Sequence, residues 1–100
     1  MSWWTAQLTC LALKYVVENA AALNVDPARL AIGGTSSGGN LAACVAQRAG
    51  QATPPIPIQF AVLGVPVCDN TATAATHKSW GDLANAPGLP APKMMWCTCD

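Results

Sequence analysis

Charged side chains are scarce in this chain of 100 residues. Asp, Glu, Lys and Arg together make up 10% of it, whereas ordinary soluble domains contain about 25%. A small domain has proportionally more surface than a large one, so it should be richer in charge. The low charge content therefore predicts that these residues form part of a larger hydrophobic core.

The sequence also lacks a surplus of either charge sign. Its formal net charge is +0 and its isoelectric point is near 6.5. Binding to nucleic acid or to an anionic membrane surface usually relies on a basic surplus, which is absent here. We therefore expect no nucleic-acid partner, and the charge balance does not favour acidic substrates.

No uninterrupted apolar run is long enough to predict a membrane span. The longest stretch near the start, residues 8–23, contains Lys14, Glu18 and Asn19, whereas a spanning helix needs about 20 predominantly apolar residues. The order of a secretory signal, a basic segment followed by a short apolar run and a small-residue cleavage site, is also absent. These residues predict a cytoplasmic protein without a membrane span.

The cysteines do not form a pattern typical of metal binding. There are five, an odd number, and most lie among apolar neighbours, as expected of buried free thiols that act as small hydrophobic side chains. The C-x-C pair Cys97 and Cys99 has no second ligand pair, and His77 lies far from it in sequence. We expect no metal site.

Apolar periodicity indicates a helix followed by a short strand in the first third of the chain. Residues from Ala6 to Leu23 have helical spacing. Asp26 and Pro27 then favour a turn, because Asp caps local backbone amides and Pro cannot continue a helix. The apolar segment 29–33 follows as a strand.

The next segments complete a strand-helix-strand unit. Residues 40–49 are typical of a small-residue helix, with Gly50 expected to end it. The run Ile58–Val67 is almost continuously apolar, which predicts a strand buried on both faces. The fold class is therefore α/β, a βαβ fragment of a doubly wound, mostly parallel sheet. Because two strands rarely form a stable sheet alone, the pattern predicts further strands outside these residues.

The remainder of the chain is less regular. A polar connection follows Cys68, and residues 93–99 predict the start of another helix. Trp80, Met94, Met95 and Trp96 could line a substrate pocket or a lid. We favour packing for them, because aromatic and Met side chains at such spacing more often fill a core.

The chemistry is concentrated in the segment Gly34-Thr35-Ser36-Ser37-Gly38. It matches G-x-S-x-G between a predicted strand and a predicted helix, which is the context of a nucleophile elbow. A sharp turn at the serine brings the incoming and outgoing backbone together, so the residues two before and two after it should lack side chains. Only Ser36 has glycine on both sides, at Gly34 and Gly38.

This register assigns two roles. Ser36 is predicted to be the nucleophile, and the backbone N–H of Ser37 is predicted to donate to an oxyanion, assisted by the dipole of the helix that starts there. A phosphate loop is disfavoured, because the glycines are not followed by Lys-Ser or Lys-Thr and no G-x-G-x-x-G register fits.

Asp69 and His77 follow Ser36 in the chain order of a hydrolase triad. They are eight positions apart in the sequence, which is a short span of chain for reaching opposite sides of a nucleophile. We therefore interpret Asp69 as a residue that caps the end of its strand and His77 as a solvated loop residue, with the catalytic role of His77 kept as an alternative.

The segment 24–42 resembles the nucleophile region of the hormone-sensitive-lipase-like esterases, in which a second glycine, here Gly39, and Asn-Leu-Ala follow the motif. The similarity continues through residues 65–69 and extends to residues 92–96. The resemblance implies an α/β-hydrolase fold and hydrolysis of small carboxylic esters through an acylated Ser36. It implies no metal or organic cofactor, because nucleophile, base, acid and hydrogen-bond donors suffice.

Three other parts of that family's active site are not visible in the sequence: an upstream His-Gly-Gly segment, a downstream Asp and a later His. Thr35 and Ser37 stand where the family often has Asp and Ala, and both substitutes are small or compatible with a turn. Residues 1–100 are thus expected to be part of an α/β-hydrolase domain and to be inactive in isolation. The alternative is a catalytically dead fragment or pseudoenzyme with at most an association role.

Overall fold

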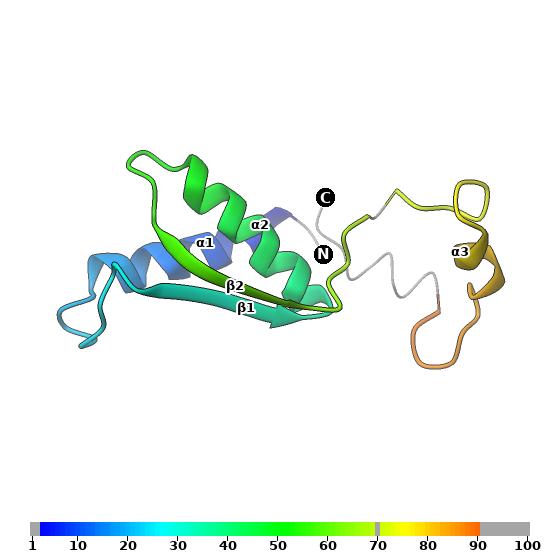
Figure 1. Cartoon of the computed structure of the whole chain (residues 1–100), viewed down its shortest axis with the longest axis horizontal. Helices are drawn as coiled ribbons and strands as arrows, with labels where there is room; N and C mark the ends of the chain where they lie inside the picture. Colours follow the sequence, from blue (N-terminus) through cyan, green and yellow to red (C-terminus); the bar gives the residue numbers. More distant parts are fainter. Residues whose placement is uncertain (1–2, 70, 91–100) are drawn as a thin grey trace.

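The computed structural model describes residues 3–69 and 71–90 (Figure 1). These residues form an α/β unit followed by a short helical segment. The elements in chain order are α1 (Trp3–Glu18), β1 (Leu30–Thr35), α2 (Ser37–Gln51), β2 (Ile58–Gly64) and α3 (Lys78–Asp82). The predicted order of helix, strand, helix and strand is therefore confirmed.

The two strands pair in parallel, as the sequence predicts. Gly34 lies opposite Leu63 and Thr35 lies opposite Gly64, with one irregularity in the register between Leu30 and Ala31. Their carboxyl ends consequently meet at one edge of the sheet (Figure 1). The connection between them contains α2, which makes the segment 30–64 a βαβ unit.

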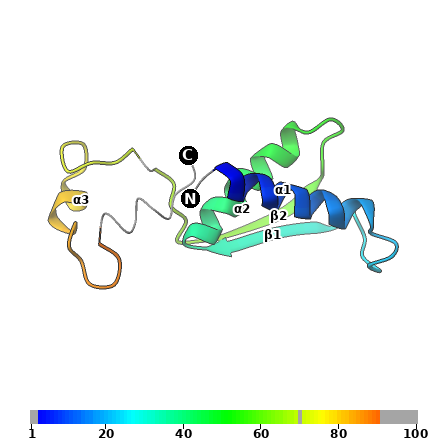
Figure 2. The ribbon, with the colours of Figure 1, turned by 180° about the vertical axis from the view of Figure 1, so that it is seen from behind.

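Both long helices lie on the same side of the sheet. Helix α2 packs against β1 and β2, and α1 packs against α2 (Figures 1 and 2). The buried positions of α2 recur every three or four residues, which is the spacing of one helical face. They are Gly39, Ala42, Val45 and Ala49. Small side chains at most of these positions let the helix approach the strands closely.

The opposite face of the sheet is open. Phe60 and Val62 on β2 are 65% and 56% exposed, and they lie opposite Ala31 and Gly33 on β1. The expectation that β2 is buried on both faces is therefore wrong for the described residues, because α1 and α2 cover only one side. Apolar residues of this size are exposed here because neither helix reaches that face.

Several element boundaries differ from those expected. Helix α2 does not end at Gly50 but continues to Gln51, with Ala52 as its C-cap, because Gly50 does not adopt the left-handed conformation that ends helices. Strand β2 ends at Gly64 rather than at Val67. Its neighbour Val65 has a φ of 39°, which is incompatible with extended backbone.

The start of the chain also differs in its details. Helix α1 ends at Glu18, and the residues up to Asn24, which has a φ of 54°, form turns instead of continuing it. Beyond them, the side chain of Asp26 accepts a hydrogen bond from the backbone N–H of Ala28 at 2.9 Å. This is the local capping that the sequence predicts for the turn.

The cysteines are less buried than their apolar neighbours suggest. Cys10 and Cys44 are partly exposed, and Cys68 is exposed, so the expectation of buried thiols is wrong for these three. Cys68 lies beyond the end of β2, directly after the buried Val67. Cys97, Cys99 and the helix expected at residues 93–99 lie outside the described residues.

Candidate functional site

Ser36 lies at the sharp junction between β1 and α2. Its backbone dihedrals, φ 58° and ψ −120°, are those of the first central residue of a type II′ turn, a position usually occupied by glycine. A side chain there costs about 1–3 kcal/mol and persists only where the surroundings enforce it. Two backbone hydrogen bonds do so: Ser36 N–H donates to the Gly64 carbonyl at 2.8 Å, and Asn40 N–H donates to the Ser36 carbonyl at 3.1 Å.

The hydroxyl of Ser36 is not used to cap the helix. Ser36 occupies the N-cap position of α2, where serine commonly accepts a hydrogen bond from a first-turn amide, but its side chain makes no capping bond. The residue is partly exposed. The Ser36 hydroxyl therefore lies at the carboxyl edge of the sheet and does not cap α2.

Ser37 is the first residue of α2. The first amides of a helix have no acceptor within it, and the helix dipole makes its N-terminus favourable for negative charge. The Ser37 N–H therefore lies at the N-terminus of α2, directly after Ser36 in the chain.

The glycines of this turn serve different steric needs. A Cβ added to Gly34 would lie 2.2 Å from the Gly38 carbonyl oxygen, and one added to Gly39 would lie 3.1 Å from Cα of Pro66. A Cβ added to Gly38 would meet nothing within 4 Å. The close approach expected at the turn therefore requires a bare Gly34 and a small residue at position 39, whereas the space around Gly38 is open among the described residues.

The chain that leaves β2 is held against the first turn of α2. The Asn40 side-chain amide donates to the Val67 carbonyl at 2.7 Å. Between them, Pro66 packs closely on Gly39, and Val65 has a positive φ of 39°, which is a rare conformation for a β-branched residue. We call residues 65–67 the exit segment. Sequence reasoning missed this role of Asn40, although its place in the first turn after the motif is a visible signal.

Asp69 and His77 are bound to neighbouring threonines, not to Ser36. The Thr71 hydroxyl and backbone N–H donate to Asp69 Oδ1 at 2.6 and 2.7 Å, and His77 Nδ1 lies 3.0 Å from the Thr76 hydroxyl. The two hydrogen bonds from Thr71 hold the pKa of Asp69 below its ordinary value of 3.8, with a smaller contribution from the charge of His77. Asp69 therefore organises the turn after β2, and His77 is an exposed residue at the start of α3.

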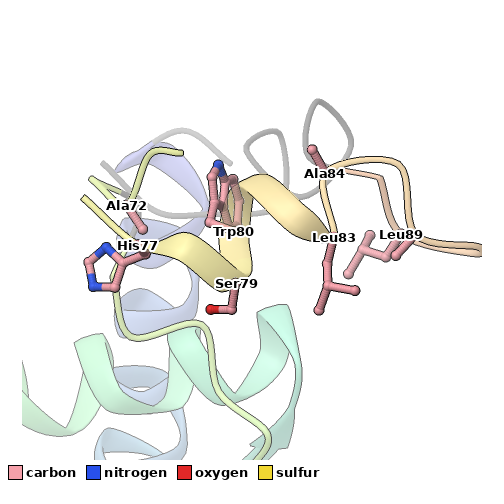
Figure 3. A pocket seen from close by; sticks show the side chains of 8 residues that line it. Ala72, His77, Ser79, Trp80, Leu83, Ala84 and Leu89 are labelled. Carbon is pink, nitrogen blue, oxygen red and sulfur yellow. The ribbon is translucent and has the colours of Figure 1, made fainter. Parts of the chain in front are cut away.

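A pocket of about 340 Å³ lies in the segment around α3 (Figure 3). Trp80, Leu83 and Leu89 provide most of its apolar lining, and His77 and Ser79 are its polar lining residues. The sequence pattern favours packing for Trp80. In the structure its side chain also lines this pocket, so packing describes only part of its environment. Met94, Met95 and Trp96 lie outside the described residues.

Residues 3–69 and 71–90 contain no candidate metal centre and no membrane-spanning helix. Nowhere in these ranges do three or more His, Cys, Asp or Glu side chains gather as a metal ion would require. Over the same ranges, no helix combines the length and the hydropathy needed to cross a bilayer.

A family model described as the alpha/beta hydrolase fold matches residues 6–99. The chain belongs to the α/β-hydrolase family. An AB hydrolase superfamily protein of Schizosaccharomyces pombe is 50% identical over an aligned stretch of 88 residues, and the match covers 85% of this chain and 25% of that protein. The carboxylesterase NlhH of Mycobacterium tuberculosis, from strains CDC 1551 and H37Rv, is 41% identical over 78 residues, which are 78% of this chain and 23% of the enzyme.

The α/β-hydrolase match agrees with the fold and with the resemblance drawn from residues 24–42. The chain spans about a quarter of the length of these curated relatives. The described residues thus provide one βαβ unit of an α/β-hydrolase sheet.

Proposed function

We propose that this chain supplies the nucleophile of a serine hydrolase that cleaves carboxylic esters, with Ser36 as the attacking residue. The observation that carries the proposal is the strained Ser36 backbone, at φ 58° and ψ −120°, combined with a hydroxyl that caps nothing. Strain of this kind is retained where a function needs the exposed side chain. The carboxylesterase among the relatives supports the choice of an ester as substrate.

In the first step, Ser36 Oγ attacks the ester carbonyl carbon, and its proton passes to a general base. The C–O bond to the alcohol then breaks as that alcohol takes up the proton, leaving an acylated Ser36. Water attacks the acyl group in the second step and releases the carboxylic acid. The Ser37 N–H and the N-terminus of α2 stabilise the negative carbonyl oxygen in both steps.

Residues outside the described segments would have to provide the general base and the acid that orients it. Asp69 and His77 are engaged with Thr71 and Thr76, and this chain spans about a quarter of the length of its relatives. We propose that the 100-residue chain alone turns over no ester, because a serine without its base is a weak nucleophile.

The proposal is tested by labelling and turnover in the full-length gene product. We expect a fluorophosphonate to label Ser36 and the protein to hydrolyse p-nitrophenyl butyrate. Ser36→Ala should abolish the label and lower kcat at least about a thousandfold. Ser37→Ala is the register control and should still be labelled, because position 37 acts through its backbone amide. Labelling that survives Ser36→Ala but is lost in Ser37→Ala would contradict the proposed register.

The second candidate is a catalytically dead relative with at most an association role. It is favoured by one observation: among the described residues, the triad candidates Asp69 and His77 are hydrogen-bonded to threonines and not to Ser36. Translation of the genomic sequence on both sides of this frame separates the two. A His-Gly-Gly segment upstream and Asp and His downstream would support the enzyme, whereas stop codons throughout would support the inactive relative.

A further inference from the structure

A second pocket, of about 250 Å³, lies where α1 and α2 pack side by side (Figure 2). Its apolar lining includes Val45 and Ala49, which are buried residues of α2. Leu13 of α1 and Ile56 of the connection to β2 add to this lining. We call this hollow the interhelical pocket. It offers an apolar surface that a hydrocarbon chain could cover.

Backbone hydrogen bonds fix one wall of the interhelical pocket. The Ala49 carbonyl accepts from the Ile56 N–H at 2.9 Å and from the Ala52 N–H at 3.3 Å. These bonds close the connection after α2 onto its last turn and hold Ile56 beside Ala49. A further hollow of about 380 Å³ shares Lys14, Ala52 and Ile56 with the pocket. A chain that outgrows the pocket can therefore extend along α1.

The charge at the interhelical pocket has one sign. Of the described residues that line it, Lys14 of α1 and Arg48 of α2 are charged, and both are cations. The ion pair found among the described residues joins Lys78 to Asp82, so neither cation is neutralised by a carboxylate there. Glu18 lines only the adjoining hollow, where it disfavours a second anion. The pocket is therefore complementary to a molecule with one anionic group and an apolar chain.

We propose that the interhelical pocket binds an aliphatic monocarboxylate. The carboxylate is held by Lys14 and Arg48, and the planar guanidinium of Arg48 can donate two parallel hydrogen bonds to it. The aliphatic chain lies on Leu13, Val45 and Ile56. Each methylene that is removed from water there should strengthen binding about fourfold.

Alkylation of Cys10 reports whether the pocket is occupied, because this partly exposed thiol lines it. The rate of its reaction with iodoacetamide is measured by peptide mass spectrometry in the full-length gene product, with octanoate as the ligand. At ten times Kd about one molecule in eleven is unoccupied, so alkylation should slow about tenfold. Cys44 and Cys68 do not line the pocket and should react at unchanged rates. At equal concentration, 1-octanol and acetate should protect Cys10 less, because one lacks the charge and the other lacks the chain.

Charge-removing variants test the two cations. Lys14→Gln and Arg48→Gln should each raise the octanoate concentration for half-protection of Cys10 about two- to fivefold, without changing protection by 1-octanol. Both side chains belong to exposed residues, so the fold should tolerate the substitutions. Arg29→Gln is the matched control, because Arg29 is also an exposed cation and does not line the pocket.

The inference does not depend on the proposed function of Ser36. Protection that is retained in Ser36→Ala supports the interhelical pocket, whereas protection lost in that variant would assign binding to the elbow and overturn the inference. It is also overturned if millimolar octanoate leaves the Cys10 rate unchanged, if 1-octanol protects equally well, or if Arg48→Gln behaves like Arg29→Gln. Ester turnover is not measured, so none of these results bears on Ser36 as a nucleophile.

Discussion

Ser36 has a backbone conformation that suits glycine better than serine. Replacing Ser36 by glycine should relieve backbone strain of about 1–3 kcal/mol. Glycine also has more conformational freedom in the unfolded chain, which lowers the free energy of unfolding by about 0.5–1 kcal/mol. We predict that Ser36→Gly unfolds with a free energy about 1–2 kcal/mol higher than Ser36→Ala, measured by urea denaturation of the full-length gene product. Both variants lack the hydroxyl, so the comparison isolates the backbone. Equal stabilities would show that the turn is not strained.

Gly34 is predicted to be the least replaceable glycine of the elbow. In Gly34→Ala the new Cβ would lie 2.2 Å from the Gly38 carbonyl oxygen, and backbone atoms must move, at a cost of about 1–3 kcal/mol or more. Gly50→Ala is the control within the same unit, since a Cβ there meets nothing within 4 Å. It should stabilise α2 by about 0.5–1 kcal/mol. Thermal unfolding of both variants checks the opposite signs.

At the scale of residues, the sequence predicted which glycine positions surround the turn but not how each is used. The spacing of Gly34 and Gly38 around Ser36 was sufficient to locate the motif. It could not reveal that the space at Gly38 is open, because that depends on which side of the helix faces the strands. The assignment of Ser36 as nucleophile stays a prediction.

At the scale of elements, the stability of the turn after β2 is predicted to depend on pH. Hydrogen bonds from the Thr71 hydroxyl and amide lower the pKa of Asp69 in the folded chain, so the turn is stabilised above pH 3.8 and loses this contribution as the pH falls through the lowered folded value. Thr71→Ala removes the hydroxyl bond and should raise the pKa of Asp69. Titration of the Asp69 carboxyl resonance by NMR measures the change. Thr76→Ala is the control, because Thr76 makes no hydrogen bond to Asp69.

Element types were easier to predict from the sequence than element ends. The apolar run 58–67 indicated a strand correctly, but its end at Gly64 depends on the positive φ of Val65. No local preference of a β-branched residue indicates such a conformation. It is held by contacts with α2 from residues distant in sequence, including the bond from Asn40 to Val67.

For the whole molecule, the open face of the sheet predicts self-association of the 100-residue chain. Phe60 and Val62 are largely exposed there, and exposed apolar strands with unpaired edges associate readily. We predict oligomers or aggregates at micromolar concentration, detected by light scattering, and a clear decrease in Phe60→Lys. Gln59→Lys adds the same charge to the neighbouring exposed residue and should have a smaller effect. Equal decreases would attribute the change to charge alone.

The hydrogen bonds that connect the elbow to the exit segment have a thermodynamic consequence. Because the Asn40 side chain binds the Val67 carbonyl while its own N–H binds the Ser36 carbonyl, one residue contacts both the proposed nucleophile and the exit segment. Substitutions in contact through a shared partner have non-additive free energies. Asn40→Ala should therefore show a coupling energy with Ser36→Gly in urea denaturation, so that the exit segment and the turn at Ser36 contribute to stability as one linked unit.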